Sequence, residues 1–102
     1  MERVMVRYKV KAEKVSENEA LIRKVFEELK RTAPTGLRYA SFKLEDGVSF
    51  VHVASIETAD GENPLRKTAA FKAFQSDLRE RCDEPPVAVD LTEIGSYRFF
   101  GG

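Results

Sequence analysis

Residues 37–58 read LRYASFKLEDGVSFVHVASIET, and this stretch decides the fold. It holds two runs rich in β-branched and aromatic residues, which predict strands at 37–45 and 48–58. Asp46-Gly47 lies between them and is a strong signal for a two-residue β-hairpin turn. Because a type I′ turn needs positive φ at both central positions, this dipeptide predicts that turn type.

The predicted turn also fixes the register of the two strands, because Glu45 then lies opposite Val48. Both faces of the hairpin are substantially apolar in this register. The pairs we expect are Phe42 with Val51 and Ala40 with Val53 on one face, and Leu37 with Ile56, Tyr39 with Ala54 and Ser41 with His52 on the other.

The segment before the hairpin predicts a strand and a helix. Residues 3–11 alternate between apolar and mostly charged positions, which is typical of a strand, and we place this strand in the centre of the sheet. Ser16 and Glu19 form a capping-box pattern that predicts the start of a helix, and Pro34 and Gly36 predict its end.

The segment after the hairpin predicts a second helix and a last strand. The helix is placed at about 65–82, with an apolar stripe that includes Phe71 and Phe74, and Glu84-Pro85-Pro86 is expected to stop it. The strand is placed at 87–99, with a bulge at Gly95.

The predicted order is therefore β-α-β-β-α-β, and the fold class is α+β. This is the ferredoxin-like arrangement, in which two helices cover one face of a four-stranded antiparallel sheet. With 102 residues, the chain is expected to be a single domain over 1–102.

A homodimer is expected because two helices can cover only one of the two apolar faces. A second copy of the chain is the simplest cover for the other face. The predicted last strand also ends in Tyr97-Arg98-Phe99-Phe100, an aromatic edge that is a liability unless it is paired. The alternative is that Phe99 and Phe100 pack against the helices of their own chain.

Composition argues against several classes of partner. Seventeen basic and seventeen acidic residues give a formal net charge of zero, which does not favour nucleic acid. No apolar run is long enough for a signal peptide or a membrane span, and one cysteine, Cys82, cannot form an internal disulfide. We expect a cytoplasmic protein with no membrane association.

His52 is the only histidine, and it is the one candidate for a catalytic side chain. It is expected opposite Ser41 with Tyr39 on the same face, so the three can form a polar cluster that lines a ligand pocket. A serine activated by His52 would need an orienting group and an oxyanion hole, and the sequence indicates neither. The plainer alternative is a histidine hydrogen-bonded at a subunit interface or strand end. Arg7 is a candidate for an anionic ligand or for interface ion pairs.

Several segments resemble the antibiotic-biosynthesis-monooxygenase-like family. Residues 34–39 (PTGLRY) resemble the Pro-Gly-x-x-x-Tyr entry to its second strand, and residues 50–58 (FVHVASIET) resemble its third strand. Residues 71–74 (FKAF) resemble the start of its second helix, and residues 8–11 (YKVK) fit its first strand. The resemblance implies a dimeric α+β barrel, in which two sheets pack face to face and each subunit has its own pocket.

Two departures from the family limit what the resemblance implies. Ile56 stands where members often have tryptophan, and this chain has no tryptophan. Ala70 stands where members often have histidine, so the axial ligand of haem-degrading members is missing from this helix. The resemblance places Ile56 among the residues expected at the ligand site, with His52, Tyr39, Ser41 and Arg7.

The expected function is a monooxygenase or related enzyme that acts on a small hydrophobic or aromatic substrate without a cofactor or metal. The alternatives are a non-catalytic dimeric ligand-binding module and a purely structural module. A cavity lined by His52, Tyr39 and Ser41 would favour the first two.

Overall fold

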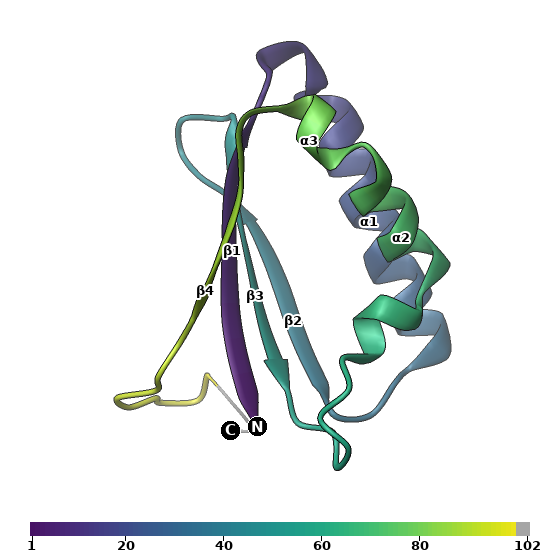
Figure 1. Ribbon diagram of the computed structural model, residues 1–102, viewed down its shortest axis with the longest axis vertical. Helices are drawn as coiled ribbons and strands as arrows, with labels where there is room; N and C mark the ends of the chain where they lie inside the picture. The colour runs from purple at the N-terminus through teal and green to yellow at the C-terminus, as the bar shows by residue number, and fades with distance from the viewer. Residues whose placement is uncertain (100–102) are drawn as a thin grey trace.

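Four strands form one antiparallel sheet in the order β2-β3-β1-β4, and the helices lie on one of its faces (Figure 1). The computed structural model describes residues 1–99. The predicted α+β fold class and ferredoxin-like order are confirmed. The elements are β1 (Glu2–Val10), the 3₁₀ helix η1 (Ala12–Lys14), α1 (Val15–Thr32), β2 (Leu37–Lys43), β3 (Ser49–Ile56), the 3₁₀ helix η2 (Pro64–Lys67), α2 (Ala69–Ser76), α3 (Leu78–Arg81) and β4 (Cys82–Asp90).

The register of the hairpin is confirmed, and β1 is central as predicted. Ser41 lies opposite His52 and Tyr39 lies opposite Ala54 between β2 and β3. On the other side of β3, His52 pairs with Val6 of β1, and Phe50 pairs with Tyr8. Because side chains alternate between the faces of a sheet, the side chains of Tyr8, Tyr39, Ser41 and His52 lie on the same face, beneath the helices.

The predicted turn type is wrong although the register is right. Gly47 has a φ of 77°, but Asp46 does not have positive φ, so the turn is not type I′. The Asp46 carboxylate instead accepts hydrogen bonds from the backbone N–H groups of Val48 and Ser49 and from the Ser49 hydroxyl. The side chain of the turn aspartate therefore closes the loop, while Gly47 alone supplies the left-handed residue.

The boundaries of the first helix differ from the prediction at its start. The helix α1 begins at Val15, directly after η1, so Ser16 is inside it and does not cap it. Its end is close to the prediction, because Ala33 adopts the left-handed conformation two residues after Arg31 and directly before Pro34.

The second predicted helix is wrong as a continuous element, because it is split into η2, α2 and α3. Thr68 separates the first two with an extended backbone, and its hydroxyl accepts from the Phe71 N–H as the N-cap of α2. The same hydroxyl donates to the Leu65 carbonyl at the end of η2. Asp77 then separates α2 from α3.

The last strand is also displaced from the prediction. The strand β4 begins at Cys82 and ends at Asp90, so Pro85 and Pro86 lie within it and Gly95 lies beyond it. Proline is tolerated because β4 is an edge strand and pairs only with β1. The pairing of β1 with β4 is irregular around Lys9, which is paired with Glu84. On each side of Glu84, β4 has one residue more than the matching part of β1.

The residues after β4 have no regular structure up to position 99. Phe99 is 67 % exposed, so it does not pack into the core beneath its own helices. The expectation for Phe100 lies outside the described residues. Among residues 1–99, no helix has the length and apolar character needed to cross a membrane.

The core lies between the sheet and the helices, and no helix of residues 1–99 covers the opposite face of the sheet. Buried apolar side chains from β1, β3, α1, η2, α2 and α3 form one cluster: Tyr8, Val10, Val25, Phe50, Leu65, Phe74 and Leu78. The uncovered side, which we call the outer face, carries Met5, Arg7, Ala40, Phe42, Val51, Val53, Val87 and Val89.

Candidate functional site

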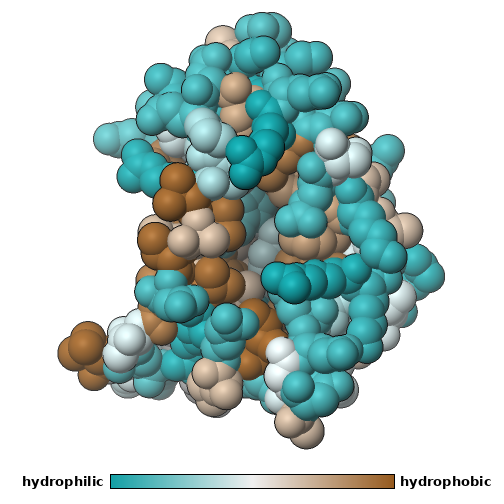
Figure 2. Space-filling model, viewed as in Figure 1, coloured by the Kyte–Doolittle hydropathy of each residue, from teal (hydrophilic) through white to brown (hydrophobic). Residues whose placement is uncertain are grey.

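A cavity of about 610 Å³ lies between the sheet and the helices α2 and α3. Figure 2 shows it as a hollow between a largely apolar surface and the more polar surface of the helices. The sheet contributes small apolar side chains, and the helices contribute aromatic ones. The apolar lining residues are Val4, Val6, Ala54, Leu65, Phe71, Phe74, Leu78, Pro86 and Ala88.

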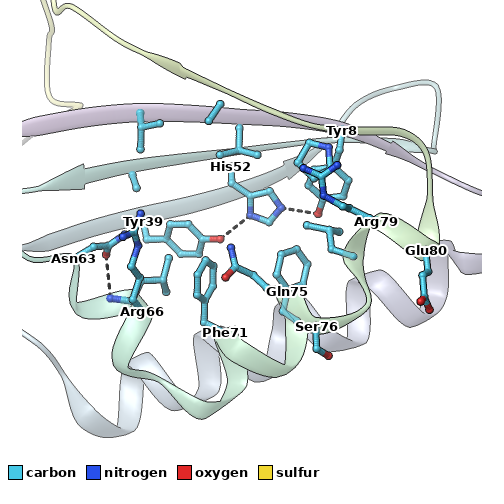
Figure 3. Close-up of a pocket in the computed structure, with 18 residues that line it drawn as sticks. Tyr8, Tyr39, His52, Asn63, Arg66, Phe71, Gln75, Ser76, Arg79 and Glu80 are labelled. Atoms are coloured by element: carbon cyan, nitrogen blue, oxygen red, sulfur yellow. Dashed lines mark hydrogen bonds between the residues drawn. The ribbon is translucent and has the colours of Figure 1, made fainter.

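His52 lies in the wall of this cavity and is only 5 % exposed. Its Nδ1 lies 2.7 Å from the Tyr39 hydroxyl and 2.7 Å from the Ser41 hydroxyl. Its Nε2 lies 2.7 Å from the Tyr8 hydroxyl (Figure 3). The strand register produces this cluster. Ser41 on β2 is paired with His52, and Tyr39 lies two residues before Ser41 on the same strand. On β1, Val6 is paired with His52, and Tyr8 lies two residues after Val6.

The hydrogen bonds continue from Tyr8 into the helices. The Asn18 amide nitrogen on α1 donates to the Tyr8 hydroxyl at 3.0 Å. Arg81 of α3 donates from Nε to the Asn18 side-chain oxygen at 3.2 Å and from Nη2 to the Phe74 carbonyl at 2.8 Å. Arg81 is 2 % exposed, and no carboxylate within residues 1–99 pairs with it.

This chain of contacts assigns the proton on His52. Arg81 can only donate, so the Asn18 oxygen accepts and the Asn18 nitrogen donates to Tyr8. The Tyr8 hydroxyl then has its own proton to donate, and His52 Nε2 is its remaining partner. Nε2 is therefore assigned as unprotonated, and in the neutral ring Nδ1 carries one hydrogen that the Tyr39 and Ser41 oxygens share as acceptors.

Burial shifts the pKa values of all three side chains in the direction that favours their uncharged forms. Burial lowers the pKa of His52 from 6.5 to about 4. Burial raises the pKa of Tyr39 to about 12, against the opposing effect of the hydrogen bond from Ser41. Burial also raises the pKa of the Tyr8 phenol well above its ordinary value, and the Asn18 hydrogen bond opposes this effect. In the assigned tautomer the Tyr39 oxygen accepts from Nδ1 of His52, so the Tyr39 hydroxyl can donate its own proton to another group.

The five residues expected at the ligand site lie in three different places. His52 and Tyr39 line the cavity, whereas Ser41 contacts His52 from outside the lining. Ile56 is buried on the same face of the sheet but does not line the cavity. Arg7 lies on the outer face, in a shallow recess with Met5, Lys9 and Glu84 among others. A role in ligand binding stays a prediction for each of them.

Sequence reasoning missed Tyr8, Asn18 and Arg81 as parts of the site. No turn connects β1 to β3, so no local signal aligns Tyr8 with His52. A weak signal did exist for Asn18, since it is a polar residue next to the apolar stripe of the first helix. For Arg81 the sequence contains no signal that distinguishes it from other arginines of its segment, such as Arg79.

No group of three or more histidine, cysteine, aspartate or glutamate side chains that could hold a metal ion exists within residues 1–99. The polar lining of the cavity consists of Asn63, Arg66, Gln75, Ser76, Arg79 and Glu80, besides the two tyrosines and His52.

No protein-family model and no curated protein matches the sequence. Solved structures match the fold. A crystal structure of an antibiotic biosynthesis monooxygenase has a TM-score of 0.75 at 18% identity, with 93% of this chain and 100% of that chain covered. Rv0793 from Mycobacterium tuberculosis has a TM-score of 0.75 at 17% identity, with coverage of 93% and 96%.

SnoaB from Streptomyces nogalater, a cofactor-independent oxygenase solved as a mutant, has a TM-score of 0.69 at 16% identity, with coverage of 95% and 96%. At such identities the likeness concerns the fold. The chain therefore has the fold of the antibiotic biosynthesis monooxygenases, and the resemblance noted in the sequence is confirmed at that level.

Proposed function

We propose that this chain binds a small aromatic molecule in the cavity and acts on it as a cofactor-independent monooxygenase. The observation that carries the proposal is the cavity itself, with the hydrogen-bonded Tyr39, His52 and Tyr8 in its wall. The names of two structural neighbours, an antibiotic biosynthesis monooxygenase and a cofactor-independent oxygenase, give further support.

The size and lining of the cavity favour an aromatic ligand. A volume of about 610 Å³ lies within the range of small-molecule sites. Phe71 and Phe74 contribute aromatic rings from α2, while Val4, Val6 and Ala54 leave room on the sheet side. A flat ligand can therefore lie between the helix and the sheet, with its polar edge at Tyr39.

Tyr39 supplies the chemistry that this proposal needs. Its phenol stays protonated at neutral pH and can donate to an oxygen of the ligand, so it stabilises that oxygen when it becomes an anion. A hydroxyarene that loses its proton to water can pass electrons to O₂ directly. Oxidation of a ring CH₂ to C=O takes four electrons from the substrate, which reduce O₂ so that one oxygen atom enters the product and the other leaves as water.

His52 favours a second candidate, a ligand-binding protein without catalysis. Both of its ring nitrogens are hydrogen-bonded, and its pKa of about 4 makes it a weak base at neutral pH. A site without a free base can bind a hydroxyarene without ionising it. The purely structural alternative is less well supported, because the space beneath the helices is not filled by side chains.

The dimer belongs to the same proposal. The outer face is rich in apolar side chains, of which Phe42 is 50 % exposed and Val87 is 59 % exposed. An antiparallel sheet that faces water would carry polar side chains there. A second copy of the chain, packed sheet to sheet, would bury this face and leave one cavity in each subunit.

Oxygen consumption tests the proposed activity. The chain is incubated with anthrone, which carries a ring CH₂, in air and under anaerobic conditions, and O₂ uptake and the quinone product are measured. We expect protein-dependent turnover in air, reduced on the order of a hundredfold in Tyr39→Phe. Tyr97→Phe is the matched control, because Tyr97 is exposed and lies outside the cavity. Binding without O₂ uptake would leave the ligand-binding alternative, and no binding would refute both candidates.

A further inference from the structure

We propose that the natural ligand of this cavity is an aromatic carboxylate, that Arg79 binds its charged group, and that Arg66 adds positive potential from the other end of the cavity. The inference rests on the proposed function, because it assumes that the cavity binds a small aromatic molecule. It adds the charge of that molecule, which neither the size nor the apolar lining of the cavity specifies.

The charged side chains around the cavity carry the argument. Arg66 from η2 and Arg79 from α3 both line it, and Glu80 is the one carboxylate among the lining residues. Neither arginine forms an ion pair with any of residues 1–99. The cavity therefore presents two guanidinium groups that form no charge-assisted pair with a carboxylate of residues 1–99.

The surroundings of Arg79 strengthen the positive potential at this end of the cavity. Arg81 lies two residues further along α3, buried and without a carboxylate partner among the described residues. Its side chain is held by Asn18 and the Phe74 carbonyl, so its charge is fixed close to the cavity wall. The side chains of Arg66 and Arg79 are themselves exposed, whereas Arg81 is 2 % exposed, so the charge of Arg81 is screened less than one in open solvent.

The arrangement of the side chains fits a ligand with a polar group at each end. Figure 3 shows Arg79 reaching from α3 toward the sheet beside Tyr8, whereas Arg66 lies on the side of Tyr39 and Asn63. Gln75 points from α2 into the space between them. The planar guanidinium of Arg79 can bind both oxygens of a carboxylate, while Tyr39 donates to a hydroxyl or carbonyl oxygen at the other end.

A matched pair of ligands tests the inference. The probes are 2-naphthoate and 2-naphthamide, which have the same ring system and differ in charge, and binding is measured by calorimetry at low and at high salt. We expect the wild-type chain to bind the naphthoate on the order of tenfold more tightly at low salt. Added salt should reduce this preference, because it screens the charge, and should leave binding of the amide unchanged.

Arginine variants locate the charge that is recognised. Arg79→Gln is expected to abolish most of the preference for naphthoate and to leave the affinity for naphthamide unchanged, and Arg66→Gln is expected to have a smaller effect. Arg31→Gln is the matched control, since Arg31 is an exposed arginine at the end of α1 that lines none of the cavities. The control should keep the full preference.

The outcomes separate this inference from the function on which it rests. Equal affinity of the wild-type chain for both probes, or a preference that survives in Arg79→Gln, overturns the anionic ligand while the cavity remains a binding site. Failure of both probes to bind at millimolar concentration overturns the binding site itself, and the inference with it.

Discussion

His52 is a buried histidine whose neutral form the structure stabilises. Among residues 1–99, its hydrogen-bond partners are the uncharged hydroxyl groups of Tyr8, Tyr39 and Ser41. Arg81 acts on it only through Asn18 and Tyr8, which fix the ring nitrogen that carries the hydrogen. The residue that the sequence indicates as the candidate catalytic side chain is thus held in a state that donates from Nδ1 and accepts at Nε2.

The lowered pKa of His52 predicts a dependence of stability on pH. The unfolded chain takes up a proton near pH 6.5, whereas the folded chain takes it up only near pH 4, so acid favours the unfolded state. The contribution is fully present above pH 6.5 and is lost as the pH falls toward 4. We expect the free energy of unfolding to fall by about 2 kcal/mol between pH 7 and pH 5.

Urea denaturation at several pH values measures this slope. The window is chosen above the range in which Asp46, Glu57 and Asp60 titrate, because the pKa of each of these carboxyls is lowered by its hydrogen bonds. A free energy of unfolding that does not change between pH 7 and pH 5 would mean that His52 is not buried in its neutral form.

Tyr8→Phe tests the hydrogen bonds that connect the sheet to the helices. The substitution leaves the Asn18 amide and His52 Nε2 without their shared partner in a buried place. We expect a loss of about 2 kcal/mol in the free energy of unfolding, measured in urea. Tyr97→Phe, at a residue that is 83 % exposed, should change it by less than about 0.5 kcal/mol. Equal effects of the two substitutions would contradict the network.

At the scale of elements, the sequence predicted what local signals specify. The turn at Asp46-Gly47 places Ser41 opposite His52, as predicted, although the predicted turn type was wrong. The position of the turn in the sequence determines the register, and the dihedral angles of the loop affect it less. The alignment of Tyr8 with His52 could not be predicted, because β1 and β3 are joined by a helix and a further strand.

The break in the second helix follows from capping that the helical periodicity conceals. Asn63 caps η2 with Pro64 behind it, and Thr68 caps α2 five residues later. Both are recognised N-cap residues, and Thr68 lies inside the span that the apolar stripe assigned to one helix. The displacement of β4 has a similar cause, since proline is a poor strand residue except on an edge, and edge position is a property of the whole sheet.

Thr68→Ala tests the cap that orients α2 over the cavity. Its hydroxyl accepts from the Phe71 N–H and donates to the Leu65 carbonyl, and Thr68 is buried. We expect a loss of about 1 kcal/mol in the free energy of unfolding. Thr32→Ala is the control, since the Thr32 hydroxyl is exposed and donates only within its own helix. An equally large loss in the control would remove the argument for capping.

For the whole molecule, the two faces of the sheet divide the proposed roles. One face carries the cavity and its hydrogen-bonded cluster, and the outer face carries exposed apolar side chains. Side chains alternate along each strand, so neighbouring residues such as Met5 and Val6 belong to different faces. A side chain that is substituted on one face therefore does not contact the residues of the other face, and the two proposed roles can be tested separately.

The dimer is tested at the outer face. Sedimentation at micromolar concentration is expected to show a dimer for the wild-type chain and a monomer for Val53→Glu and Val87→Glu, because each substitution would bury a charge between two sheets. Val87 is already exposed, so the second variant is expected to fold. Ala20→Glu, on the exposed surface of α1, should remain a dimer. A monomeric wild-type chain would refute the proposal.

Methyl-resolved NMR tests whether a small aromatic molecule binds beneath the helices. Intermolecular contacts between 2-naphthoate and the methyl groups of the chain distinguish the two faces of the sheet. We expect contacts to the cavity-lining residues Val4, Val6, Ala54, Leu65 and Ala88. Contacts only to Val51, Val53, Val87 and Val89 of the outer face, or none at millimolar concentration, would contradict it.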